Sequence, residues 1–122
     1  MAIRAIYEFA GNAGNGGQRM NINIIDYIPK GYDNAISRKN LSIVTGLQDR
    51  VVRRLIEEAR RETIIIANDD GSGYWRFPDE PTQEEVALLH KFVHQQESRA
   101  KSIFYALYPA RKAIKEGATN GN

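Results

Sequence analysis

The chain has 122 residues, 42% of them apolar, which is enough for one domain with a modest core. Its 17 Lys and Arg outnumber its 15 Asp and Glu by only two, so any attraction to nucleic acid has to come from locally clustered bases. The sequence has no cysteine and no window near the ~18 apolar residues of a membrane span. These features exclude disulfides and thiolate metal sites, and they predict a cytoplasmic protein without membrane association.

Residues 1–20 are expected to form a flexible N-terminal arm. The segment AIRAIYEFA alternates as in a strand from Ile3 to Phe9, but it also forms a helical stripe from Ile3 to Ala10. The following GNAGNGGQ has the composition of a linker. It lacks the Gly-Lys-Ser/Thr ending of a phosphate-binding loop, so a linker is favoured over a nucleotide site.

Three helix patterns follow. Asn21 or Asn23 can cap a short helix that Pro29 stops. Ser37 can cap a second helix, which ends at Gly46, where a left-handed residue is wanted. Residues 47–62 predict a third, longer helix.

After residue 62 the spacing of the apolar residues changes from that of a helix, about 3.6 residues, to that of a strand, two residues. Residues 63–68 and 73–77 flank Asp70-Gly71, which predicts a β-hairpin. Alternation places one of Tyr74 and Trp75 toward the core and the other outward. Packing on the third helix is favoured for these aromatics over stacking on a base or sugar.

Residues 37–62 carry seven Lys or Arg against four acids. In the third helix Arg50, Arg54 and Arg61 fall opposite an apolar sector that contains Val52, Leu55, Ile56 and Ala59. This basic face has two interpretations. It is either an ordinary solvated surface with ion pairs to Glu57 and Glu58, or a surface that lies on DNA.

The run ISRKNL at 36–41 and TGLQDRVVRRLI at 45–56 resembles the core of winged helix-turn-helix DNA-binding proteins, in particular small phage and prophage proteins of Gram-positive hosts. The resemblance covers residues 36–77, about a third of the chain. It implies an α+β, mostly α fold, with a winged helix-turn-helix core at 21–81, a β-hairpin wing and a long C-terminal helix. It also implies double-stranded DNA binding, sequence-specific or structure-directed, by a phage-type transcriptional regulator or a replication-associated factor.

The resemblance further implies which residues contact DNA. One group is expected to lie at base edges or close to them: Gln48, Asp49, Arg50, Val51 and Arg54. A second group is expected to contact phosphates: Arg38, Lys39 and Arg53. Arg61 and Arg76 complete the expected DNA-binding set. One departure favours a different function, because residues 63–81 hold four acids and only one base, Arg76. The alternative is a protein–protein adaptor that docks host or phage replication machinery.

Residues 82–116 predict a long dimerisation helix. Thr82 and Glu85 have the spacing of a capping box. A heptad seam follows, consisting of Val86, Leu89, Val93, Gln96, Ala100, Ile103 and Leu107 and continuing to Ala110 and Ile114. We expect a homodimer, with folding back onto the chain's own domain as the alternative. Pro109 can begin a separate terminal helix.

The bases that follow Pro109 have two interpretations. Arg111, Lys112 and Lys115 either complement the helix dipole, which is favoured, or contact phosphate. Residues 117–122 are expected to form a disordered tail.

No enzyme is predicted. His90, His94 and Glu97 have a spacing that can hold a metal, but nothing nearby compels a third ligand and solvated side chains are favoured. No nucleophile lies in a pattern with its base. The sequence therefore predicts no catalytic residues, no metal and no cofactor.

Overall fold

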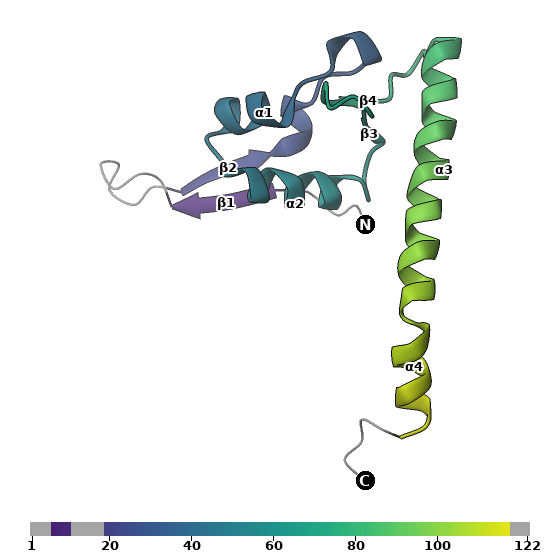
Figure 1. The fold of residues 1–122 in the computed structure, drawn as a ribbon. Helices are drawn as coiled ribbons and strands as arrows, with labels where there is room; N and C mark the ends of the chain where they lie inside the picture. The colour runs from purple at the N-terminus through teal and green to yellow at the C-terminus, as the bar shows by residue number, and fades with distance from the viewer. Residues whose placement is uncertain (1–5, 11–18, 118–122) are drawn as a thin grey trace. The chain divides into compact units, whose positions relative to one another are not determined.

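The structure is a computed structural model that describes residues 6–10 and 19–117. It is an α+β chain with mostly helical content, as the sequence predicts. Residues 1–86 and 87–122 form two compact units, which are described separately. Figure 1 shows the elements along the chain.

The first unit begins with a β-hairpin. Strand β1 (Ile6–Ala10) pairs antiparallel with β2 (Arg19–Asn23), with Ile6 opposite Asn23 and Ala10 opposite Arg19. The ambiguous segment is therefore a strand over residues 6–10. The boundary expected after residue 20 falls inside β2, and the Gly-rich residues 11–18 lie outside the described residues.

A single 3₁₀ turn replaces the first expected helix. The turn η2 (Ile24–Tyr27) is capped by Asn23, whose Oδ1 accepts a hydrogen bond from the Ile25 N–H at 3.1 Å. Ile24 and Ile28 are fully buried, and the four-residue turn gives way to extended backbone at Ile28. Asn23, and not Asn21, is thus the cap. A second 3₁₀ turn, η3 (Tyr32–Asn34), follows.

Two central helices are connected by a short turn that begins at Gly46. Helix α1 (Arg38–Thr45) is capped by Ser37, whose side chain accepts from the Asn40 N–H at 3.0 Å. Gly46 has φ of +73°, the left-handed conformation expected of a helix C-terminal glycine. Helix α2 (Asp49–Ala59) then runs back across the core, where Val52, Leu55 and Ile56 are buried against α1, η2 and β2 residues.

The second hairpin is shorter than expected. Strands β3 (Ile65–Ala67) and β4 (Tyr74–Arg76) pair antiparallel, with Ile66 opposite Trp75. Ile36 forms a further bridge to Tyr74, through N–H···O bonds of 2.9 and 2.8 Å. The segment that enters α1 is therefore joined to the hairpin as a third, one-residue strand.

The long helix starts on the first unit. In α3 (Gln83–Ala106), the Glu85 N–H donates to Thr82 Oγ1 at 3.1 Å and Glu85 Oε1 accepts from the Thr82 N–H at 2.9 Å, which confirms the capping box. Helix α4 (Tyr108–Lys115) follows with Pro109 in its first turn, where the missing N–H costs no helical bond. The long C-terminal helix is therefore two helices, divided at Leu107.

Candidate nucleic-acid interface

The outer face of α2 carries exposed cations. Arg50, Arg53 and Arg54 are all exposed, while the apolar side of the same helix is buried. Arg61, just beyond the C-terminus of α2, is exposed as well. This division follows from the apolar period of the helix, which fixes one side in the core and leaves the guanidinium groups outside.

Two of the arginines around α2 form ion pairs along the helix. Arg54 Nε lies 4.0 Å from Glu58 Oε1, and Arg60 Nη1 lies 2.9 Å from Glu57 Oε1. Arg60 Nε also donates to the Ile65 carbonyl at 3.1 Å, so this arginine joins the helix to β3. Arg50, Arg53 and Arg61 form no ion pair with any side chain of residues 22–117. The interpretation of the basic face as an ordinary solvated surface with ion pairs therefore applies to Arg54 and Arg60.

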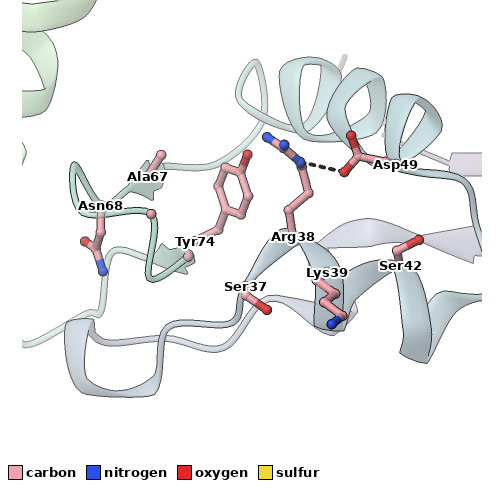
Figure 2. A pocket seen from close by; sticks show the side chains of 10 residues that line it. Ser37, Arg38, Lys39, Ser42, Asp49, Ala67, Asn68 and Tyr74 are labelled. Atoms are coloured by element: carbon pink, nitrogen blue, oxygen red, sulfur yellow. Dashed lines mark hydrogen bonds and ion pairs between the residues drawn. The ribbon is translucent and has the colours of Figure 1, made fainter.

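Arg38 connects the N-termini of both central helices with the hairpin. Its Nε donates to Asp49 Oδ1 at 2.6 Å, and the pair is about half exposed. A hydrogen bond to the Tyr74 side chain and then the Asp49 carboxylate raise the pKa of the Arg38 guanidinium. Figure 2 shows Arg38 extending between these two partners. Two side chains expected to face DNA, Arg38 and Asp49, therefore lie together.

A cavity of about 570 Å³ surrounds this pair (Figure 2). The N-termini of α1 and α2 form one wall and the hairpin forms the other. Its lining includes the polar residues Ser37, Arg38, Lys39, Ser42, Asp49, Asn68 and Tyr74. Lys39 is exposed. The sequence did not place Ser42, Asn68 or Tyr74 at this site, because no local pattern reports that residues 38 and 74 meet.

The structure corrects the placement of Val51. Only 7% of this residue is exposed, and it belongs to the core cluster with Leu47 and Leu55. The side chain of Val51 is therefore too buried to contact a base edge directly. On the helical wheel Val51 stands at the flank of the apolar sector, and neighbouring elements cover that flank.

Arg76 also has a different role from the expected one. Its Nε donates to the Ile28 carbonyl at 2.6 Å, and its backbone N–H donates to the Pro29 carbonyl at 2.8 Å. These bonds hold β4 against residues 28–31. Arg76 therefore has a structural role, and its expected contact with DNA stays a prediction.

The turn of the hairpin is acidic and ordered by its own hydrogen bonds. Asp70 Oδ1 accepts from the Ser72 N–H at 2.9 Å, and the bonds from the Ser72 backbone and side chain lower the pKa of the Asp70 carboxyl. Asn68 accepts from Trp75 Nε1 at 2.8 Å. Trp75 is fully buried and makes an edge-to-face contact with Tyr32 of η3, which favours packing over base stacking for this aromatic; the contact is with η3, whereas the third helix was expected. Tyr74 is partly buried.

The seam of α3 is uncovered in the chain. Val93, Ile103 and Leu107 are 44%, 57% and 47% exposed, and Gln96 and Ala100 are exposed too. Of the α3 residues only Glu85 is buried, and none of α4 is. The described helices therefore present a row of mostly exposed apolar side chains, which polar Gln96 interrupts.

His90 and His94 are exposed on α3. In the part of the chain that the structure describes, no three His, Cys, Asp or Glu side chains gather in an arrangement that could hold a metal ion. Nor does any helix among the described residues have the length and apolarity to cross a membrane. In comparisons with known proteins, no family model matches this chain, and neither a curated protein nor a solved structure matches it.

Proposed function

We propose that the first unit is a winged helix-turn-helix domain that binds double-stranded DNA. The order α1, left-handed turn at Gly46, α2, then hairpin β3–β4 is that of this fold, and the bridge from Ile36 to Tyr74 supplies its short third strand. In this arrangement α2 is the helix that enters the major groove, and the hairpin is the wing.

The single observation that carries the proposal is the exposed cationic face of α2. Arg50, Arg53 and Arg54 point outward from a helix whose other side is locked in the core. Arginine suits this role because its guanidinium can donate two parallel hydrogen bonds to guanine or to phosphate. Arg38 and Lys39 at the start of α1 add phosphate-binding charge beside it.

The proposal extends to a homodimer. The exposed seam of α3, from Val86 to Leu107, has the heptad spacing with which helices pair. A dimer would present two α2 helices to the DNA. A phage-type transcriptional regulator or a replication-associated factor fits such a protein.

The test is fluorescence anisotropy with pooled DNA duplexes at two salt concentrations. The wild-type chain should bind at low salt and bind more weakly at high salt, because phosphate contacts release counterions. Arg50→Ala combined with Arg54→Ala should weaken binding at least tenfold. Arg99→Ala combined with Lys101→Ala, which removes the same charge from α3, is the matched control, and light scattering must show that this variant keeps the oligomeric state of the wild type. No binding at low salt, or equal loss in both variants, would refute the proposal.

A second candidate function is a protein–protein adaptor. The acidic turn at Asp69 and Asp70 favours it, because these charges would repel phosphate if the wing approached DNA. Under this hypothesis the purified chain has a low 260/280 nm absorbance ratio. It also forms a complex of fixed stoichiometry with a host or phage replication protein. DNA binding abolished by the α2 substitutions would remove this alternative as the main function.

A further inference from the structure

We propose that the α3 seam pairs with a second copy of this chain in the antiparallel orientation. The inference rests on the homodimer proposed above and is independent of DNA binding. Three features of the described helices carry it: the uncovered seam, the order of large and small residues along it, and the charges at its two ends.

The seam is the surface to be covered. Val86, Val93, Ile103 and Leu107 are large apolar side chains that are more than a third exposed, spaced so that they follow one side of the helix. Leu107 stands between α3 and α4 in the right-handed helical conformation; its N–H donates to the Phe104 carbonyl at 3.1 Å and its carbonyl accepts from the Arg111 N–H at 2.9 Å. The seam therefore continues past the helix break to Ala110.

Charge is sorted along these helices. Residues 83–97 of α3 hold three acids and one base, a net charge of −2, whereas residues 98–117 hold five bases and one acid, a net charge of +4. A parallel pair would place acid beside acid at one end and base beside base at the other. An antiparallel pair places each acidic half beside the basic half of its partner. At helix separations of about 8–10 Å these charges lie within about one Debye length.

Side-chain size points to the same orientation. In a parallel pair each seam residue meets its own copy, so Ala100 meets Ala100 and leaves a void. In an antiparallel pair an a position packs beside a d position of the partner. With the two-fold axis at Ser98, large residues then meet small ones or fit one another: Val86 with Ala110, Leu89 with Leu107, Val93 with Ile103 and Gln96 with Ala100.

The orientation sets how far apart the two copies of the first unit are attached. The two copies of Ala87 would lie about 33 Å apart along an antiparallel pair, because the helix rises about 1.5 Å per residue. In a parallel pair they would lie about one helix spacing apart, roughly 10 Å. This difference is large enough to measure directly.

The test uses the absence of cysteine in the chain. Val93→Cys and Ile103→Cys are purified separately, with different tags, and mixed under oxidising conditions. The antiparallel dimer should give the mixed Val93→Cys/Ile103→Cys disulfide, whereas a parallel dimer would link Val93→Cys to itself. A spin label on Ala87→Cys, outside the seam, should report about 33 Å by electron-spin distance measurement, including the label's own reach.

The outcomes separate the hypotheses. Light scattering at twice the chain mass, with the mixed disulfide and the long label distance, supports the antiparallel pair. A dimer with the self-linked disulfide and a label distance under about 20 Å overturns the orientation and leaves the homodimer standing. A monomer in light scattering overturns both. DNA binding is decided by the anisotropy assay alone.

Discussion

Gly73 is expected to be the glycine on which the hairpin most depends. Its φ is +137°, a conformation that costs a side-chain-bearing residue about 1–3 kcal/mol. A Cβ at this position would overlap the Ile36 carbonyl group and would lie 2.8 Å from the Ser37 nitrogen. Both are backbone atoms, so no side-chain rotation can relieve the overlap. In Gly73→Ala the backbone around Ile36 must move, and the two hydrogen bonds between Ile36 and Tyr74 are lost. At about 0.5–1.5 kcal/mol each, they add about 1–3 kcal/mol.

The expected total for Gly73→Ala is therefore about 4 kcal/mol, a large part of the stability of a domain this size. Gly71→Ala is the matched control, because Gly71 also has positive φ, +78°, but a Cβ on Gly71 would have no atom within 4 Å. That variant should lose only about 1–2 kcal/mol of backbone strain. Urea unfolding followed by circular dichroism measures both. Equal losses in the two variants would refute the argument from the Ile36 contact.

Three further outcomes are expected. Leu55→Ala should lower the free energy of unfolding by about 3–5 kcal/mol in urea titrations, because Leu55 is almost fully buried and its removal leaves a cavity. Glu85 accepts hydrogen bonds from the Thr82 and Tyr32 N–H groups, and these bonds lower the pKa of its carboxyl. Its contribution to the free energy of unfolding is therefore complete above the unfolded pKa of about 4.3, and it is lost as the pH falls through the lower folded pKa. Unfolding at pH 3 and pH 7 should therefore show a smaller pH dependence in Glu85→Gln than in the wild type. Arg38→Gln should change stability by less than about 1 kcal/mol, because its pair with Asp49 is about half exposed, yet it should reduce the slope of DNA affinity against salt.

Local signals predicted the helix ends well. Ser37, Gly46 and the pair Thr82–Glu85 act through atoms at most four residues away, so the sequence alone contains the whole interaction. The division at Pro109 has the same origin, because a proline lacks the N–H that a helix interior needs. Features of this kind require no knowledge of tertiary structure.

Contacts between distant segments were not predictable in the same way. Arg38 meets Tyr74, and Arg76 meets the Ile28 carbonyl, only because the hairpin folds back against the segment before α1. The helical wheel predicts the direction in which the Val51 side chain points. It does not predict that neighbouring elements extend far enough to bury it. The strand β1 was ambiguous for a related reason, since its partner β2 lies beyond the Gly-rich segment and the two periods fit equally well.

The low net charge of the whole chain does not weaken the case for a local DNA-binding surface, because the three acids of α2 form ion pairs. Asp49 pairs with Arg38, Glu57 pairs with Arg60, and Glu58 pairs with Arg54. In contrast, Arg50 and Arg53 form no ion pair with any side chain of residues 22–117. Charge that is already paired adds little to the field beyond its immediate surroundings, so the exposed arginines dominate the outer face of α2. Each phosphate that this face neutralises should contribute about −0.9 to the slope of log affinity against log salt. A slope near zero for a duplex that still binds would show that these cations are not the contact surface.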